Sequence, residues 1–526
     1  MSITKSPAPH SKRHLVKSSF MISLGVLTSR FLGFIRDVVL ANLLGTGFIA
    51  EAFFVAQRIP NLLRDLVGEG AANAAIVPVL SEYQKTKSKE QWMKLVNVLL
   101  AWGTIILTIL TILGFILTPW IIRLMAPGFL GKASQFYLTV DLTRMMFPYL
   151  ILIALTALQM GILYTLNSFT APAFSSCLLN IAMILSAWVA TFFSWGAAYI
   201  LAIGVVIGGV LQLLWQGQAL AQLGVKWSWP SRLRHEGVGV IAKLLMPRLW
   251  GSAVYQMNIF VDTLCASLAF IVGPGGIAAI YFANRLVQFP LGVFAYAASS
   301  ASLSSLSTLS SQGDYVTFKE NLLFLLKNLL FILLPCAVAL FILSPILVKT
   351  IFERGAFDTY STSITSSALQ FLCLGLPFFG ATRILLSGFY AMQDTKTPVR
   401  IATVCLLVNV ILNVILMFPL KIGGIALASS LSGAANFIML FMTMTDRLGG
   451  SKNILKKFFL RIIPCLVMMG SVMFLFLTLL SAPALPKIIM VGSIGGITYL
   501  LCCQFMKVSE VRPLWRTLKK KSGISR

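Results

Sequence analysis

The stretch AFFVAQR, residues 52–58, returns in altered form as AIYFANR at residues 279–285, an offset of 227 residues. Two further pairs keep nearly the same offset: MAPGF at 125–129 with FERGAF at 352–357, and YTLNSFTAP at 164–172 with YAMQDTKTP at 390–398. Three pairs at a nearly constant offset predict an internal repeat. Each copy of the repeat contains six of the membrane spans described below. An even number of spans returns the chain to the same side of the membrane, so we expect two parallel halves related by an axis along the membrane normal.

The sequence between these motifs is apolar enough to cross a membrane many times. Of its 526 residues, 58% are hydrophobic and 11% are charged, whereas soluble proteins carry roughly 25% charged residues. Apolar runs of about 20 residues, the length that spans a bilayer as a helix, recur throughout. We therefore expect an all-α polytopic membrane protein. Fourteen spans are predicted near residues 18–43, 48–80, 92–119, 138–165, 173–195, 198–221, 239–271, 276–308, 321–347, 363–391, 400–419, 423–445, 458–481 and 486–506.

The repeat and the spans together predict how the chain is divided. Spans 13 and 14 have no counterpart in the repeat, so the architecture is six plus six plus two. The expected segments are a basic N-terminal tail (1–17), an N-lobe of spans 1–6 (18–221), a linker (222–238), a C-lobe of spans 7–12 (239–445), spans 13 and 14 (446–506) and a basic C-terminal tail (507–526).

The formal net charge is +26, and the positions of the basic residues along the chain show what this charge indicates. If both termini are cytoplasmic, the inner segments hold 28 of the 42 Lys and Arg residues and the outer segments hold six. Such a bias is the positive-inside pattern of membrane proteins. It predicts cytoplasmic termini and a membrane protein that does not bind nucleic acid.

The remaining eight basic residues lie inside the spans, and all are arginine: Arg30, Arg36, Arg58, Arg64, Arg144, Arg248, Arg285 and Arg383. Inserting an unpaired charge at the middle of the membrane costs at least ~2.5–3.5 kcal/mol of free energy, so charged residues at this depth indicate a functional or structural role. Arginine suits phosphate because its planar fork donates two hydrogen bonds at once. Six carboxylates in or near the spans can offset them: Asp37, Glu51, Asp65, Glu69, Asp141 and Asp262. The surplus of arginine predicts a cationic cavity for an anionic cargo.

The arginines of spans 1, 2 and 8 are the strongest candidates for binding that cargo: Arg30, Arg36, Arg64 and Arg285. Arg144 and Arg383, near span ends, are more typical of side chains that snorkel to the interface. Buried ion pairing is the alternative for all of them. On span 1, Asp37 lies two helical turns from Arg30 and shares its face, whereas Arg36 is expected to point elsewhere. We therefore expect Arg30 to be compensated and Arg36 to be free.

Enzyme chemistry has no support in the sequence. The three histidines, His10, His14 and His235, lie in polar segments, and no nucleotide, metalloprotease or nucleophile-elbow motif is present. The eight cysteines include no CxxC pair, which speaks against a zinc site or a disulfide framework. We expect no enzymatic activity, no cofactor and no transport driven by ATP in this chain.

Long motifs now support a family resemblance. They are SRFLGFIRD at 29–37, AFFVAQRIPNLLRDLVGEGA at 52–71, ANRLVQFPLGV at 283–293, LMAPGF at 124–129, IFERGAF at 351–357 and QDTKTPV at 393–399. Together they resemble the MurJ/MviN family of the multidrug/oligosaccharidyl-lipid/polysaccharide exporter superfamily, over almost the whole chain. The resemblance implies two six-helix lobes that form a V-shaped cavity, and a final helix pair that lines a groove for a polyprenyl tail.

The resemblance also implies a function and its residues. Members flip lipid II, a polyprenyl-pyrophosphate-linked peptidoglycan precursor, from the inner to the outer leaflet of the bacterial inner membrane by alternating access. The cavity arginines of the family match Arg30, Arg36, Arg64 and Arg285, the substrate-binding set. The supporting set is Asp37, Glu51, Arg58, Glu69, Asn284 and Gln288. Some members carry Asp and Glu where this chain has Asn284 and Gln288, which puts an acidic role there in doubt.

Some members bind a cation between spans 7, 11 and 12, where Asp262, Asn409 and Asn413 correspond. Two asparagines that pack helices by hydrogen bonds are the equal alternative. The residues leave open whether a monovalent cation or the membrane potential drives transport. The expected partners are lipid II or a similar polyprenyl-pyrophosphate lipid, membrane lipids and proteins of cell-wall synthesis.

Three other functions compete with lipid II transport. A flippase for another polyprenyl-linked oligosaccharide would share the arginine cavity. A multidrug antiporter would need exposed carboxylates for cationic drugs, whereas this chain has surplus arginine. A non-transporting scaffold for cell-wall enzymes would not need buried arginines.

Overall fold

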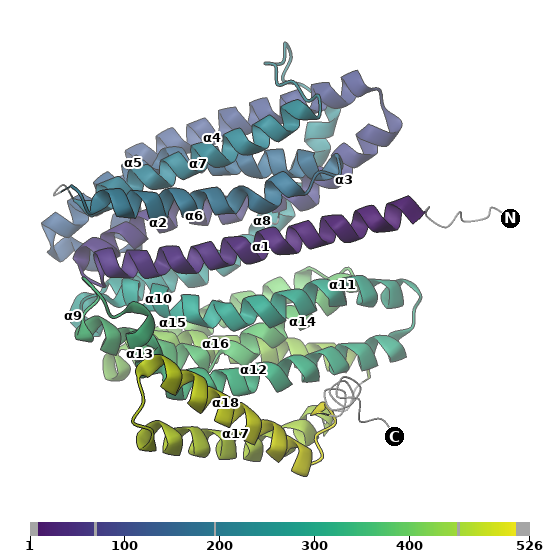
Figure 1. The fold of residues 1–526 in the computed structure, drawn as a ribbon. Coiled ribbons are helices and arrows are strands. Elements are labelled where there is room, and N and C mark those ends of the chain that lie inside the picture. The colour runs from purple at the N-terminus through teal and green to yellow at the C-terminus, as the bar shows by residue number, and fades with distance from the viewer. Residues whose placement is uncertain (1–8, 68–70, 194–195, 450–452, 512–526) are drawn as a thin grey trace. The chain divides into compact units, whose positions relative to one another are not determined.

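The computed structural model describes residues 9–67, 71–193, 196–449 and 453–511, and all regular elements in these ranges are helices (Figure 1). Ten of the helices in these ranges are long and apolar enough to cross a membrane, or eleven if one bent pair counts as a single span. The protein is thus an all-helical, multi-pass membrane protein, as predicted. The chain divides into two compact units, Met1–Leu264 and Cys265–Arg526.

Unit 1 holds the first helices: α1 (Pro9–Leu44), α2 (Phe48–Val67), α3 (Ala71–Thr86), α4 (Lys89–Met125), a 3-10 turn (Pro127–Gly131), α5 (Ala133–Thr165), α6 (Thr170–Ala190), α7 (Ala197–Gln222) and α8 (Glu236–Ser267), which crosses the unit boundary. Helix α5 packs against α2, α3, α4 and α7, and α6 packs against α1 and α7. Helix α1 begins at Pro9, well before the first expected span.

The segment between α7 and α8 is attached to unit 1. The side-chain amide of Asn97 on α4 donates to Ser228 Oγ at 2.9 Å, and Trp102 Nε1 donates to the Leu233 carbonyl at 2.9 Å. Ile241 of α8 is buried in the same apolar cluster as Leu95 and Leu163. The start of α8 therefore belongs to the core of unit 1.

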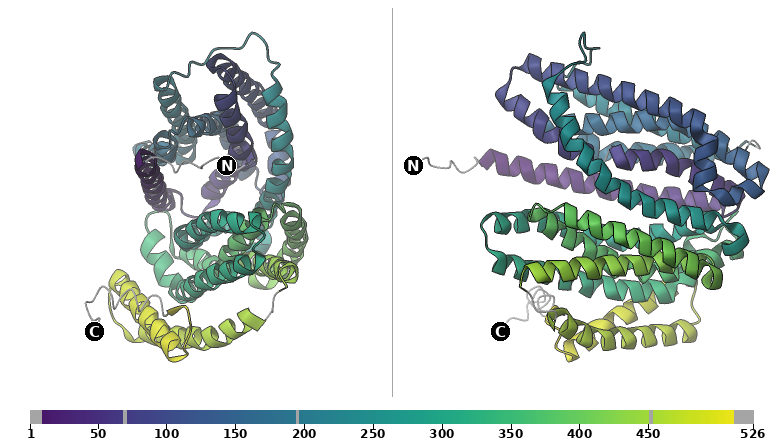
Figure 2. Two further views of the ribbon diagram at one scale, coloured as in Figure 1. Left: turned by 90° about the vertical axis from the view of Figure 1, so that its right-hand side faces the viewer. Right: turned by 180° about the vertical axis from the view of Figure 1, so that it is seen from behind.

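Unit 2 holds the remaining helices: α9 (Ala269–Val272), α10 (Gly276–Pro290), the π-helical turn η2 (Leu291–Ala295), α11 (Tyr296–Ser311), α12 (Tyr315–Phe352), α13 (Thr359–Cys373), α14 (Leu376–Ala391), α15 (Lys396–Leu420), α16 (Ile422–Arg447), α17 (Asn453–Leu479) and α18 (Ala484–Phe505). Helices α13 and α14 pack against α12 and α16, and α15 packs against α16. Figure 2 shows α17 and α18 as a hairpin at the edge of this unit, in contact with α12.

Proline interrupts two of the expected spans. Helix α10 continues into α11 through the π-helical turn that follows Pro290. Helices α13 and α14 meet at a bend of 44°, two residues before Pro377. Both changes follow from the missing N–H of proline and from the clash of its ring with the preceding turn. In contrast, α5 continues through Pro148 as a single helix.

Two loops at corresponding positions in the units share one backbone geometry. The α5–α6 loop holds Asn167 at φ 57°, and the α14–α15 loop holds Gln393 at φ 58°. The next amide in each loop, that of Ser168 or of Asp394, donates at 2.9 Å to the carbonyl five residues earlier. This is the hydrogen bond that closes a helix with a left-handed residue at its end. These loops are the ones in which the sequence pair 164–172 and 390–398 repeats.

Asp394 fixes the α14–α15 loop through three contacts. Its Oδ1 accepts from the backbone amides of Lys396 and Thr397, both at 3.0 Å, so it caps α15. Its Oδ2 pairs with Arg447 Nη1 of α16 at 2.6 Å. Burial opposes ionisation of this carboxyl, but the hydrogen bonds from Thr397 and the pairing with Arg447 together lower its pKa from 3.8 to about 2.

We expect Asp394→Ala to lower the free energy of unfolding by about 1 kcal/mol, the usual loss for a helix cap. Asp394→Asn should cost less, because the amide oxygen still caps the helix and only the charge is lost. Since the folded pKa is depressed, the charge stabilises the protein above pH 3.8, and this contribution is lost as pH falls through about 2. Thermal unfolding of the detergent-solubilised protein ranks the stability of wild type, Asp394→Asn and Asp394→Ala. Equal stability of Asp394→Ala and wild type would contradict this account.

Candidate functional site

The buried arginine of α1 is held by two helices. Arg36 is 8% exposed, and its Nε and Nη2 donate to Asp37 Oδ1 at 3.1 and 2.8 Å. Its Nη1 donates at 2.9 Å to Oδ1 of Asn180 on α6. Asn180 in turn donates to the carbonyl of Ser29 on α1 at 3.0 Å. The result is a buried ion pair whose guanidinium is fixed in orientation by the packing of α1 on α6.

This network corrects one prediction. We expected Arg36 to point away from Asp37 and to remain uncompensated, but it is ion-paired with Asp37. Neighbouring residues do leave a helix in different directions. The arginine side chain is long enough to fold back onto the carboxylate beside it, however, while its Nη1 reaches Asn180 of α6. Arg30, by contrast, is exposed.

Two more predicted residues of unit 1 contact neighbouring helices. Glu51 in the first turn of α2 is 3% exposed and accepts a hydrogen bond from Gln135 Nε2 of α5 at 3.1 Å. A carboxylate is favoured in a first helical turn by the positive end of the helix dipole. Arg58, on the same helix, donates from Nη1 to Thr263 Oγ1 of α8 at 2.6 Å. These bonds join α2 to α5 and to α8. The side chain of Arg64, and Glu69 as a whole, lie outside the described residues.

Two of the eight arginines inside the predicted spans lie in unit 2, and each is held by a tyrosine. Arg285 on α10 lies over the ring of Tyr281, 4.7 Å from its centroid, and its Nη2 donates to the Tyr281 hydroxyl at 2.9 Å. Arg383 on α14 lies 3.9 Å from the ring centroid of Tyr296 and donates to its hydroxyl at 2.7 Å. Stacking on an aromatic face orients a guanidinium without neutralising it. Both arginines are therefore positioned cations.

The remaining predicted residues differ in their exposure. Beside Arg285, Asn284 is half-buried and Gln288 is exposed. Asn409 and Asn413 of α15 are fully buried, and Asn413 Nδ2 donates to Asn409 Oδ1 at 3.0 Å, so they share a helix face as predicted. Asp262 belongs to unit 1 and is half-buried. The described residues include no cluster of three or more His, Cys, Asp or Glu side chains arranged to hold a metal ion.

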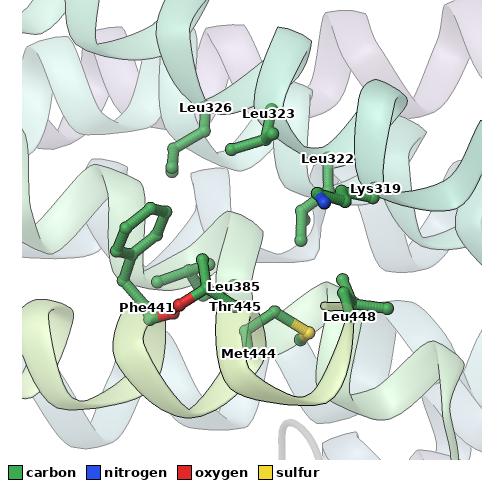
Figure 3. Close-up of a pocket in the computed structure, with 9 residues that line it drawn as sticks. All are labelled: Lys319, Leu322, Leu323, Leu326, Leu385, Phe441, Met444, Thr445 and Leu448. Atoms are coloured by element: carbon green, nitrogen blue, oxygen red, sulfur yellow. Dashed lines mark hydrogen bonds between the residues drawn. The ribbon is translucent and has the colours of Figure 1, made fainter. Parts of the chain in front are cut away.

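A crevice between α12, α14 and α16 is apolar and does not suit an anion (Figure 3). Leu322, Leu326 and Leu385 line it, and Phe441 and Met444 face them from α16. Two polar side chains are part of its wall, and both are already bonded. Lys319 Nζ donates to the Gly449 carbonyl at 3.1 Å, and the hydroxyl of Thr445 donates to carbonyls of its own helix.

Sequence reasoning missed the neutral partners of the arginines. Asn180 is a lone amide inside the apolar run of α6, and such a residue in a membrane helix often bonds to a neighbouring helix. Tyr281 precedes Arg285 by one helical turn, a spacing that brings two side chains together. Both signals were present in the sequence, whereas Thr263 and Tyr296 are brought to their arginines by tertiary packing.

Comparison with known proteins identifies the family. The family model described as lipid II flippase MurJ matches residues 40–492. The chain belongs to this family. A probable lipid II flippase MurJ of Buchnera aphidicola subsp. Acyrthosiphon pisum is 34% identical over 435 residues, which cover 82% of this chain and 84% of that relative. The lipid II flippase MurJ of Burkholderia cenocepacia is 33% identical over 444 residues, with 82% and 84% covered.

Solved structures agree with this membership of the MurJ family. A lipid II flippase MurJ in an inward closed conformation superposes with a TM-score of 0.80 at 29% identity, over 93% of this chain and 99% of that chain. An inward-facing multidrug resistance MATE transporter of the MOP superfamily superposes with a TM-score of 0.69 at 15% identity. The match covers 82% of this chain and 98% of the transporter. The second likeness shows a shared fold only.

The buried ion pair of α1 makes a stability prediction for this MurJ family member. Arg36→Met leaves the Asp37 carboxylate buried without its arginine and should cost about 3 kcal/mol or more. The double variant Arg36→Met/Asp37→Asn removes both charges and should lose less. Thermal unfolding in detergent compares the two variants. A double variant less stable than the single one would show that the ion pair is not what Arg36 contributes.

Proposed function

We propose that this protein moves lipid II from the inner to the outer leaflet of the bacterial inner membrane by alternating access, without enzymatic chemistry. Family membership supports the cargo. The single structural observation that favours it is the presence of guanidinium groups, rather than ammonium groups, held by Asn180, Tyr281 and Tyr296 within apolar helices. A rigidly held planar fork is suited to a pyrophosphate.

We propose fourteen spans with both termini in the cytoplasm, arranged as two parallel six-helix lobes and a final pair. The shared geometry of the Asn167 and Gln393 loops supports the parallel repeat. So does the order of packing. In unit 1, α6 contacts α7 and α4 contacts α5, and in unit 2, α15 contacts α16 and α12 contacts α13 and α14. These matched features are what a parallel repeat of six helices predicts.

The arginines are proposed to have two roles, contact with the cargo and positioning of helices. Arg30 is exposed and Arg285 is oriented by Tyr281, so these two, with Arg64, are the proposed contacts of the pyrophosphate. Three donor groups of Arg36 are engaged by Asp37 and Asn180, so Arg36 sets the position of α1 and the local field. Glu51 and Arg58 hold α2 in place through Gln135 and Thr263.

Coupling is proposed to use a monovalent cation or the membrane potential. Asn409 and Asn413 offer amide oxygens on one face of α15, and these oxygens are the proposed cation ligands within unit 2. Replacing sodium by a large organic cation in the transport assay separates an ion-driven mechanism from one that uses the potential alone. Membrane lipids and proteins of cell-wall synthesis are the other proposed partners.

The central test is lipid II translocation by reconstituted protein with single arginine substitutions. Arg30→Ala or Arg285→Ala should lower cargo affinity about tenfold or more, because a charge-assisted hydrogen bond contributes roughly 1.5–3 kcal/mol. Arg30→Lys and Arg285→Lys should recover part of the activity, because the charge remains and the fork is lost. Near-normal transport by both Ala variants at matched expression would rule out the proposed contacts. Arg123→Ala provides the control, since Arg123 lies over Trp120 at the end of α4.

The final helix pair is proposed to carry the polyprenyl tail. Helices α17 and α18 are attached to α12, where the Tyr499 hydroxyl donates to the Phe331 carbonyl at 2.8 Å. Deleting residues 458–526 should abolish lipid II transport while a soluble fragment of the head group still binds, because only the tail contact is lost. A stably inserted truncation that still transports lipid II would contradict this role.

A further inference from the structure

A groove between α12 and α13 takes no part in the arginine sites. Six polar residues of α13 line it: Thr359, Thr362, Ser363, Ser366, Ser367 and Gln370. They alternate at intervals of three and one residues, so they lie on one face of the helix. Lys349 of α12 and Glu353, the residue that follows this helix, form part of the opposite wall. We call this feature the α13 groove. It is open to solvent along much of its length.

One buried hydroxyl of the α13 groove lacks a partner within the described part of the chain. Ser366 is 5% exposed, and its Oγ makes no hydrogen bond there. Thr362, one turn earlier, is satisfied because its hydroxyl donates to Glu353 Oε2 at 2.7 Å. A buried polar atom without a partner costs free energy and calls for an explanation. A bound polar group in the groove would provide the missing hydrogen bond to Ser366.

The charges of the α13 groove offset each other. Lys349 Nζ lies 3.7 Å from Glu353 Oε1, and the second oxygen of that carboxylate accepts from Thr362. The other polar groups of the wall are hydroxyls and one amide, which can both donate and accept. A neutral ligand rich in hydroxyl and amide groups matches this wall. A phosphate would meet the Glu353 carboxylate, and a hydrocarbon chain would leave the hydroxyls unsatisfied.

We propose that the α13 groove binds a neutral sugar ring of the lipid-linked cargo, with Ser366 Oγ as a buried hydrogen-bonding partner. This inference rests on the proposed function, because it assigns the sugar of the cargo to unit 2. In the proposed topology, the end of α12 and the start of α13 face the outer side. The groove would then hold the sugar after it has crossed.

The test uses full-length protein in liposomes with two cargo lipids, lipid II and a polyprenyl pyrophosphate without sugar. The groove variant is Ser363→Ala/Ser366→Ala/Ser367→Ala. The control is Thr365→Val, which removes a buried, unpartnered hydroxyl from the same helix outside the groove. The groove variant should bind lipid II about tenfold more weakly, from the loss of two or three neutral hydrogen bonds. It should bind the sugar-free lipid as wild type does, and the control should bind both lipids as wild type does.

A soluble N-acetylglucosamine disaccharide, followed by saturation-transfer NMR, separates the two possible failures. If wild type binds the disaccharide and the groove variant does not, the groove is a sugar site even if lipid II proves not to be the cargo. Unchanged binding of both lipid II and the disaccharide by the groove variant overturns the inference and leaves lipid II transport intact. Equal loss of lipid II binding in the Thr365→Val control also overturns it, since a general defect of α13 would then be the cause. Thermal unfolding within the error of wild type confirms that each variant is folded.

Discussion

The cost of placing a charge in an apolar helix is the constraint on which the rest of the molecule depends. Arg36 is compatible with α1 because Asp37 neutralises it and Asn180 occupies a third donor group. That requirement ties α1 to α6. Glu51 and Arg58 tie α2 to α5 and α8 in the same manner. In unit 1, therefore, three residues that we assigned to the cargo site from the sequence also determine which helices pack together: Arg36, Glu51 and Arg58.

In unit 2, the arginines inside apolar helices are accommodated by aromatic rings. Arg285 and Arg383 lie against tyrosines, which orient the guanidinium and leave its charge in place. Stacking fixes the plane of the guanidinium fork, and a fork of fixed orientation suits a phosphate. Arg285 and Arg383 are thus oriented by a neutral ring, whereas Arg36 is oriented by a buried carboxylate and an amide. Transport by alternating access requires that the affinity for the cargo differ between conformational states. If every state bound the cargo equally tightly, the cargo would not be released.

Much of the fold could be predicted from the sequence because long apolar runs permit only helices in a membrane. The π-helical turn after Pro290 and the bend before Pro377 could be anticipated in position, since proline marks both. The matched loops at Asn167 and Gln393 follow from the repeated motif. The pairing within α1 could not be predicted, because helical periodicity gives the direction in which a side chain leaves the helix and not how far it folds back. The hydroxyl face of the α13 groove was also missed, because serine and threonine do not interrupt an apolar run.

The central proposal is that Arg30, Arg64 and Arg285 contact the pyrophosphate of the lipid. The most direct measurement is photo-crosslinking with a lipid II analogue that carries its reactive group beside the pyrophosphate, followed by mass-spectrometric mapping of the labelled peptides. The account predicts labels in α1 or α2 of unit 1 and in α10 of unit 2, all of which disappear when unlabelled lipid II is added. Labels confined to one unit, or found only on the exposed apolar face of α4, would contradict it.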